Sequence, residues 1–295
     1  MCDDLTNNDV ESYFRRRGIT RRSFGKAGLG AALAAVLPIG ARAEAVVEEK
    51  VKVPTPDGEA DGYFVHPAEG RHPGVILWPD IFGMRPAFRQ MGKRLAESGY
   101  SVLVVNPYYR TTRAQLIPDE AKTIDPELRK KIWPRAKELA GTLSPATSVV
   151  DGRAFVEFLD RQPSVDNSKK IGTMGFCMTG SYAFRLSADM PERIGAGASF
   201  HGGGLVTDGE DSPHRLVPKI KAGFLVAIAE NDDERDPEAK VALREAFDSA
   251  GVPAEIEVYE GTLHGWCPTD SAVHNPAKAR HAWNRALALF ERHLG

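Results

Sequence analysis

The pattern of hydrophobic and polar positions from residue 46 onward predicts β-strands that alternate with α-helices. Two short alternating segments, Val47–Val53 and Gly62–Val65, flank residues 56–58, whose sequence Pro-Asp-Gly is typical of a tight turn. They predict an antiparallel hairpin. Later apolar runs suit strands that are buried on both faces: Gly74–Trp78, Ser101–Asn106, Ile171–Met174, Ala196–Phe200, Phe224–Ala229 and Ala254–Tyr259.

Helical spacing fills most of the gaps between these runs. The predicted helices are Pro86–Ser98, Pro145–Arg161, Met178–Ala188, Pro237–Ala250 and Pro276–His293. Residues 111–144 are less regular, and an amphipathic stretch near Leu128–Leu139 could form a lid or a flank over an active site. The alternation predicts an α/β fold: a doubly wound, mostly parallel sheet with an antiparallel N-terminal hairpin.

Composition supports one large domain and argues against nucleic acid as a partner. The 295 residues are 42% hydrophobic and 26% charged, and a chain of this length buries roughly 70–75% of the surface that its unfolded form exposes. Residues 1–43 hold seven basic and four acidic side chains, so their removal changes the net charge from −2 to −5. Without a basic cluster beyond those residues, we expect no binding to nucleic acid.

The N-terminal segment resembles an export signal. Thr20–Lys26 reads T-R-R-S-F-G-K, which is similar to the twin-arginine motif, and the apolar run Ala27–Ile39 follows it. That run is shorter than the roughly 20 residues that a membrane-spanning helix needs. The alternative is an ordinary N-terminal helix with a basic start.

Cleavage after Ala43 would give a signal peptide of residues 1–43 and a mature domain of residues 44–295, and cleavage after Ala45 is also compatible with the small residues there. No cysteine follows the apolar run, so a lipid anchor or other stable membrane anchor is not expected. The segment predicts that the twin-arginine export machinery recognises the precursor. The mature protein is then expected to be periplasmic or secreted.

The strongest chemical signal is Gly175–Gly180, which reads G-F-C-M-T-G. A predicted strand leads into this segment and a predicted helix leaves it, so Cys177 lies at the strand-to-helix turn where α/β-hydrolases place their nucleophile. The start of that helix would add a favourable partial positive charge near the sulfur. A buried structural cysteine is the alternative, because free cysteines are among the most buried residues.

The order of residues along the chain favours the nucleophile. In this fold an acid and a histidine follow the nucleophile at the ends of later strands, and Asp232 and His264 occupy those places. His264 would take the thiol proton of Cys177, and Asp232 would orient the imidazole.

Two of these assignments have rivals. The acids near Asp232 are Asp233, Glu234 and Asp236, of which Asp236 is the second choice. His201 follows a predicted strand and precedes three glycines, a string similar to the oxyanion loop of some esterases. That loop lies before the nucleophile in those enzymes, so a structural role or a place at the pocket rim suits His201 better.

Four segments together resemble the dienelactone hydrolase family: Trp78–Gly83, Gly175–Gly180, the Asp232 loop and His264–Trp266. They follow the family's order over about residues 50–294. The resemblance implies hydrolysis of an enol lactone or a related ester through a cysteine acyl-enzyme. It implies neither a metal nor an organic cofactor.

The resemblance also implies roles for individual residues. Ile81 and Met178 would donate backbone N–H groups to an oxyanion, and Asp80 matches an acidic residue that contacts the resting thiol in the family. The family often has glutamate at the position of Asp80, so the shorter side chain puts this contact in doubt. The expected substrate pocket includes side chains near these residues: Phe82, Trp266 and His201.

Departures from the family concern the substrate more than the reaction. Pro268 stands where well-known members keep a substrate-binding arginine. An exposed helix charge is the favoured interpretation of Arg129 and Arg135, and replacement of that arginine by either one is the alternative. Thr179 stands where glycine is common and predicts slightly different packing behind the turn.

Cysteine usage fits an enzyme. Cys2 would leave with the signal peptide, and Cys267 is interpreted as a packing residue beside the site, with a redox role as the minor alternative. A non-catalytic ligand-binding protein on the same scaffold and a thiol redox protein are the other function classes considered. The first would not need the ordered Cys, His and Asp, and the second is weakened by the lack of a Cys-x-x-Cys pair.

Overall fold

A computed structural model describes residues 45–295 of the chain. Its centre is an eight-stranded sheet in the order β1-β2-β4-β3-β5-β6-β7-β8. The strands are β1 Val46–Thr55, β2 Gly58–Pro67, β3 Gly74–Trp78, β4 Ser101–Val105, β5 Ile171–Phe176, β6 Ile194–Phe200, β7 Gly223–Ala229 and β8 Ala254–Tyr259. The helices are α3 Pro86–Ala96, α4 Pro126–Ala140, α5 Pro145–Asp160, α6 Gly180–Asp189, α7 Pro213–Leu216, α8 Glu230–Arg235, α9 Ala239–Ala250 and α10 Pro276–Leu294, with short 3-10 turns η1 Cys177–Thr179 and η2 Val217–Lys219.

The N-terminal hairpin and the parallel strands are as predicted. β1 and β2 pair antiparallel through a turn that brings Thr55 opposite Gly58, and β2 pairs antiparallel with β4. Every later neighbour pair in the sheet is parallel. The prediction of an α/β-hydrolase fold, with a mostly parallel sheet and an antiparallel N-terminal hairpin, is therefore confirmed.

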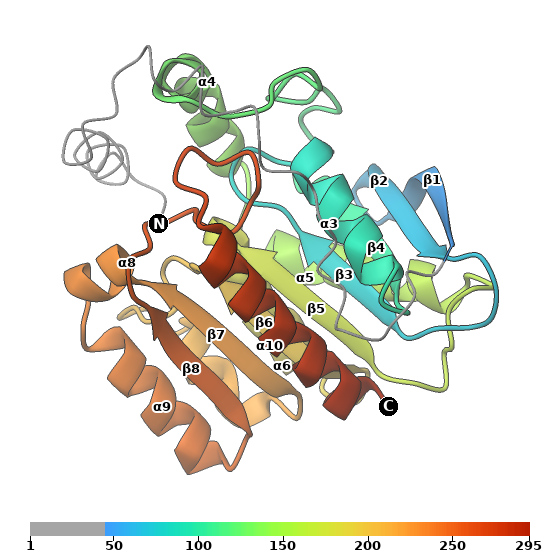
Figure 1. Ribbon diagram of the computed structural model, residues 1–295. Helices are drawn as coiled ribbons and strands as arrows, with labels where there is room; N and C mark the ends of the chain where they lie inside the picture. Colours follow the sequence, from blue (N-terminus) through green and yellow to red (C-terminus); the bar gives the residue numbers. More distant parts are fainter. Residues whose placement is uncertain (1–44) are drawn as a thin grey trace.

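Helices cover both faces of the sheet, as Figure 1 shows with α3 and α10 in front and α5 and α6 behind. One apolar core lies between the sheet and α3 and α10, and a second lies between the sheet and α5, α6 and α9. This double covering explains why β3 and β4 are continuous apolar runs whose residues are all buried.

Proline and capping side chains explain where α4 and α5 begin. α4 and α5 each begin with proline at the first helical positions, and the side chains of Asp125 and Ser144 accept hydrogen bonds from the N–H groups of Leu128 and Thr147. The amphipathic stretch predicted near Leu128–Leu139 is thus a regular helix, α4. Its buried side includes Ile132, Trp133 and Ala136, which pack with Ile81 and Phe82 in a third cluster.

Two predicted helix starts were wrong. The helix expected from Met178 begins as the 3-10 turn η1 and becomes α-helical only at Gly180. The helix expected from Pro237 begins at Ala239, and the separate six-residue helix α8 precedes it. Asp236 separates the two helices because helical geometry is disfavoured for a residue before proline, and its φ of −140° and ψ of 73° are not helical.

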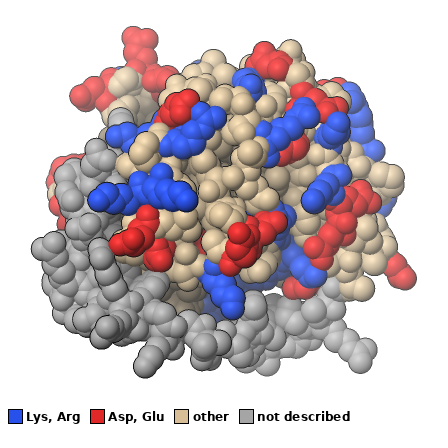
Figure 2. Space-filling view, turned by 90° about the horizontal axis from the view of Figure 1, so that it is seen from above, with Lys and Arg blue, Asp and Glu red and all other residues tan. Residues whose placement is uncertain are grey.

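The predicted signal peptide, residues 1–43, lies outside the described residues. Within residues 45–295, no helix combines the length and the apolar character needed to cross a membrane. Figure 2 shows basic and acidic side chains interspersed over the face that it presents.

Candidate active site

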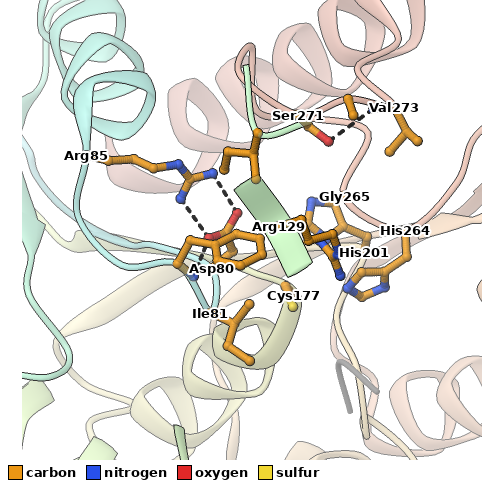
Figure 3. A pocket seen from close by; sticks show the side chains of 13 residues that line it. Asp80, Ile81, Arg85, Arg129, Cys177, His201, His264, Gly265, Ser271 and Val273 are labelled. Carbon is orange, nitrogen blue, oxygen red and sulfur yellow. Dashed lines mark hydrogen bonds and ion pairs between the residues drawn. The ribbon is translucent and has the colours of Figure 1, made fainter. Parts of the chain in front are cut away.

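The predicted site residues gather at one edge of the sheet. Each follows a different strand at its carboxyl end: Asp80 after β3, Cys177 after β5, His201 after β6, Asp232 after β7 and His264 after β8. In an open, mostly parallel sheet this edge is where ligands bind. Figure 3 shows all but Asp232 around one pocket.

Cys177 occupies a sharp, strained turn between β5 and η1. Its φ is 57°, a left-handed conformation that is uncommon for a residue other than glycine. The turn needs glycine on both sides. A Cβ on Gly175 would lie 2.0 Å from the carbonyl oxygen of Thr179, and one on Gly180 would lie 2.4 Å from Ser199 Oγ. The local sequence therefore places the Cys177 side chain at the pocket wall, at the strand-to-helix turn where a nucleophile was predicted.

Thr179 closes this turn from behind. Its Oγ1 accepts a hydrogen bond from the N–H of Phe176 at 2.9 Å and lies 3.0 Å from the carbonyl oxygen of Trp78 and 2.9 Å from that of Pro79. The hydroxyl thus links the turn after β5 to the end of β3. Thr179 was predicted to change the packing behind the turn, and this hydrogen-bonded link is the change that the structure shows.

Asp232 and His264 form the acid–histidine pair. The Oδ2 atom of Asp232 lies 2.7 Å from Nδ1 of His264, and the side-chain oxygen of Asn231 accepts the backbone N–H of His264 at 2.8 Å. An Nδ1–H that donates to the carboxylate leaves Nε2 of a neutral imidazole as a proton acceptor. Burial alone would raise the pKa of Asp232, but the charge and hydrogen bond of His264 hold it below its ordinary value.

The neighbouring acids have other contacts. Asp233 pairs with Lys240 at 2.6 Å, and Asp236 ends α8. The choice of Asp232 over Asp236 as the acid beside the histidine agrees with this geometry.

The pocket also contains a half-buried arginine from α4. Arg129 lines the pocket, and its guanidinium carbon lies 5.2 Å from the ring centroid of Phe82 and 4.7 Å from that of Trp133. Burial lowers the pKa of Arg129 to about 10, with Asp80 acting in the opposite direction. The favoured interpretation of Arg129 as an exposed charge was therefore wrong. For Arg135 it was right, because this half-exposed residue pairs with Glu138.

The loop after β3 has a fixed conformation. Asp80 Oδ1 accepts the N–H of Phe82 at 2.9 Å, and the Tyr108 hydroxyl donates to the carbonyl oxygen of Ile81 at 2.7 Å. Both oxygens of Asp80 also accept hydrogen bonds from Arg85, at 2.7 and 2.9 Å. The expected contact between Asp80 and the resting thiol stays a prediction, as do the oxyanion roles of Ile81 and Met178.

His201 is buried against the histidine of the pair. Its side chain lines the pocket with 1% of its surface exposed, and its ring centroid lies 5.0 Å from that of His264 in an edge-to-face contact. Neither ring nitrogen has a hydrogen-bond partner among residues 45–295, and the φ of 40° is again left-handed. Burial, assisted by the neighbouring His264, holds the pKa of His201 well below its ordinary value.

Other expected site residues occupy supporting positions. Phe82 lines the pocket, but Trp266 does not: it is fully buried behind His201 and stacks on Tyr259 with ring centroids 4.7 Å apart. Cys267 is a buried free thiol in the core between the sheet and α10, and burial raises its pKa well above the ordinary value. It is a packing residue, as predicted.

Sequence reasoning missed two members of the site, Arg85 and Asp270. Their ion pair at 2.6 Å joins segments 185 residues apart, so no local spacing could have indicated it. No group of three or more His, Cys, Asp or Glu side chains within residues 45–295 is arranged to hold a metal ion.

Comparisons with known proteins agree with this architecture. The family model for the dienelactone hydrolase family matches residues 60–294. The carboxymethylenebutenolidase of Rhodococcus opacus is 27% identical over 229 residues, which cover 75% of this chain and 81% of that protein. The Pseudomonas putida carboxymethylenebutenolidase is 23% identical over 243 residues, covering 82% and 95%.

Solved structures share the fold. A dienelactone hydrolase from Anabaena variabilis superposes with a TM-score of 0.58 at 15% identity, covering 85% of this chain and 99% of that one. A dienelactone hydrolase-like promiscuous phosphotriesterase from metagenomic libraries gives a TM-score of 0.67 at 22% identity, covering 85% and 100%. With a family match over most of its length, the chain belongs to the dienelactone hydrolase family and is a hydrolase.

Proposed function

We propose that the protein hydrolyses a lactone or another carboxylic ester through a Cys177-His264-Asp232 triad and a thioacyl-enzyme. The observation that carries this proposal is the 2.7 Å contact between Asp232 and Nδ1 of His264, in a site where His264 and the strained Cys177 line the same pocket. Family membership supports ester chemistry, and the curated relatives are named for the hydrolysis of a butenolide.

In the first half-reaction His264 takes the thiol proton, and the thiolate of Cys177 attacks the carbonyl carbon. The new C–S bond puts negative charge on the carbonyl oxygen, for which the N–H groups of Ile81 and Met178 are the proposed donors. Collapse of this intermediate breaks the ester C–O bond, and His264 returns the proton to the leaving oxygen. In a lactone that oxygen stays attached to the acyl group.

In the second half-reaction His264 takes a proton from water, and the hydroxide attacks the thioester carbon. Cleavage of the C–S bond releases the carboxylic acid, and His264 returns its proton to the sulfur, which restores the thiol of Cys177. Asp232 accepts the hydrogen bond from Nδ1–H throughout, and its carboxylate stabilises the imidazolium that forms twice in each cycle. The lowered pKa of Asp232 means that it is ionised at neutral pH.

The pocket walls indicate the polarity of the substrate. Phe82, Ile124 and Val273 contribute apolar surface, while Arg129 adds a positive charge that is partly desolvated. An arginine held on two aromatic rings is suited to an acyl group that carries an acidic or strongly polar substituent. Arg129 is therefore the proposed substitute for the arginine that Pro268 replaces.

The test is hydrolysis of p-nitrophenyl acetate and of dienelactone by the purified protein, the Cys177→Ala variant and protein treated with iodoacetamide. We expect Cys177→Ala to lose several orders of magnitude in turnover, as enzymes do when their nucleophile is removed. A burst of p-nitrophenol equal to one per site would report the acyl-enzyme. Near-normal turnover by a folded Cys177→Ala protein would refute the mechanism.

A further inference from the structure

We propose that Arg85 is a positioning residue: by binding Asp80 and Asp270 together, it holds the loop of Ile81 in place against the loop of His264. This inference rests on the proposed ester-hydrolase function, because it assigns Arg85 to the alignment of the oxyanion donors with the triad.

Arg85 joins two loops that are distant in sequence. Its Nη1 and Nη2 donate to the two oxygens of Asp80 at 2.7 and 2.9 Å, and its Nε and Nη2 donate to the two oxygens of Asp270 at 2.6 and 3.1 Å. Figure 3 shows the Arg85 side chain extending across the pocket wall toward Asp80. One guanidinium thus binds both carboxylates in a bidentate manner, which only the planar fork of arginine allows.

Each carboxylate is in turn tied to its own loop. Asp80 accepts the N–H of Phe82 through its side chain and that of Gly83, at 2.9 Å, through its carbonyl oxygen. Ile81 therefore lies within the turn that these two hydrogen bonds close. Asp270 comes six residues after His264, and its carbonyl oxygen accepts the N–H of Ile124 at 2.7 Å, just before α4. The cluster of Asp80, Arg85 and Asp270 therefore connects the proposed oxyanion loop, the histidine loop and the segment that leads into the pocket-lining helix.

Burial restricts the geometry of this ion cluster. The exposed fractions are 1% for Arg85 and 6% for each aspartate, so none of the three charges is well hydrated. Burial alone would lower the pKa of Arg85, but the charges of Asp270 and Asp80 raise it instead, so the guanidinium remains charged. A desolvated ion cluster tolerates few alternative geometries, because displacement of one partner leaves a buried charge without compensation.

His264 does not depend on Arg85 for its own position. Asp232 and Asn231 already bind its ring and its backbone N–H. The element that Arg85 fixes is therefore the loop of Ile81, with Asp270 as the anchor on the histidine side. Loss of Arg85 should impair stabilisation of the oxyanion while leaving the reactivity of the thiolate nearly unchanged.

The chain contains a matched control. Arg110 also bridges two carboxylates, Asp57 and Asp151, with contacts of 2.6 to 2.9 Å, and Asp151 is buried. Neither Arg110 nor its partners line the pocket. A purely structural role for Arg85 would make the two arginines equivalent in every activity measurement made on folded protein.

The experiment compares Arg85→Lys, Asp270→Asn and Arg110→Lys with the unaltered protein, using p-nitrophenyl acetate hydrolysis and the rate of iodoacetamide attack on Cys177 against pH. We expect Arg85→Lys to lower kcat by roughly 10- to 100-fold with little change in KM, because small displacements of oxyanion donors have effects of this size. Alkylation should change by less than about threefold. Arg110→Lys should leave both rates unchanged.

Asp270→Asn keeps the proposal testable if Arg85→Lys does not fold, because asparagine can still accept a hydrogen bond and one carboxylate remains for Arg85. We expect it to lower kcat by roughly 3- to 30-fold, again with alkylation preserved. Asp80→Asn, measured alone and combined with Asp270→Asn, completes a double-mutant cycle. The double variant should lower kcat by less than the product of the two single factors, because both substitutions act through Arg85.

Normal kcat in a folded Arg85→Lys or Asp270→Asn protein, or strictly multiplicative losses in the double variant, would overturn the positioning role. These outcomes are separate from failure of the proposed function, which would appear as ester hydrolysis by Cys177→Ala.

Discussion

At the scale of single residues, Asp232 tests the triad most sharply, because three other acids follow it within four positions. Asp232→Asn should keep the fold but favour the wrong imidazole tautomer. We expect turnover to fall by roughly 10- to 10³-fold, less than in a serine triad because a thiol depends less on its base. Asp233→Asn and Asp236→Asn serve as controls and should change turnover little. The measurement is kcat/KM for p-nitrophenyl acetate, together with the pH dependence of iodoacetamide attack.

A rise in the apparent thiol pKa in Asp236→Asn, with none in Asp232→Asn, would assign the acid to Asp236 instead.

His201 carries a prediction about stability. Its folded pKa lies well below the value of about 6.5 expected for the unfolded chain. As the pH falls below 6.5, the unfolded state binds a proton that the folded state does not, so the free energy of unfolding decreases. Between pH 7.5 and 5.5 this one group should lower the free energy of unfolding by at most about 1.4 kcal/mol, the amount reached when the folded ring takes up no proton.

His201→Phe removes that contribution, and urea unfolding at both pH values measures it. His274 also has a pKa lowered by burial, but it is present in both proteins and cancels in the comparison. Identical pH dependence in the two proteins would show that His201 does not remain neutral in the folded state.

Sequence reasoning anticipated which residues follow the strands at the site better than which residues support them. Cys177, Asp232 and His264 were predicted because each follows a strand in a fixed chain order, and the structure brings them to one edge of the sheet. Arg85 and Asp270 were not identified, because their interaction exists only after β3 and the loop after β8 come together. Arg129 was misjudged for a related reason: helical spacing predicted α4 but not which of its charged residues face the pocket.

At the scale of elements, the turn between β5 and α6 depends on one hydroxyl. Thr179 is fully buried, and its Oγ1 accepts the N–H of Phe176 and contacts the carbonyl oxygens of Trp78 and Pro79. Thr179→Val conserves volume but leaves these groups without their partner. We expect it to lower the free energy of unfolding by about 1–3 kcal/mol.

Thr179→Ser is the matched control, since it keeps the hydroxyl and removes only a methyl group. Urea unfolding of both variants measures the difference. If Thr179→Val were as stable as Thr179→Ser, the hydroxyl would not be what holds the turn.

The strands were predicted more accurately than the helix starts around the site. Continuous apolar runs mark β3, β4 and β7 because helices cover both faces of the sheet. Residues 177–179 and 230–235 were harder, because short 3-10 and α-helical turns lack a full period of hydrophobic spacing. These irregular turns are also where Cys177 and Asp232 lie. The local sequence pattern therefore does not predict the backbone at positions where tertiary contacts determine its conformation.

At the scale of the whole molecule, one pocket draws on segments from most of the chain. Its walls come from the loop after β3, from α4, from the turn after β5 and from residues 264–273. The backbone bond between Ile124 and Asp270 joins the α4 side of this wall to the histidine side. Because Arg129 lies on α4, changes in the packing of that helix should alter KM for acidic esters more than for neutral ones.

The last prediction concerns the precursor. We propose that residues 1–43 direct twin-arginine export, so a reporter fused to residues 1–45 should reach the periplasm. Arg21→Lys with Arg22→Lys keeps both positive charges but removes the guanidinium groups that define the motif. We expect this double variant to block export, measured as reporter in the periplasmic fraction. Arg15→Lys with Arg16→Lys is the matched control, with the same change in chemistry outside the motif, and should be exported normally. Continued export of the Arg21 and Arg22 variant would instead indicate the general secretory route, since that route requires only positive charge before an apolar run.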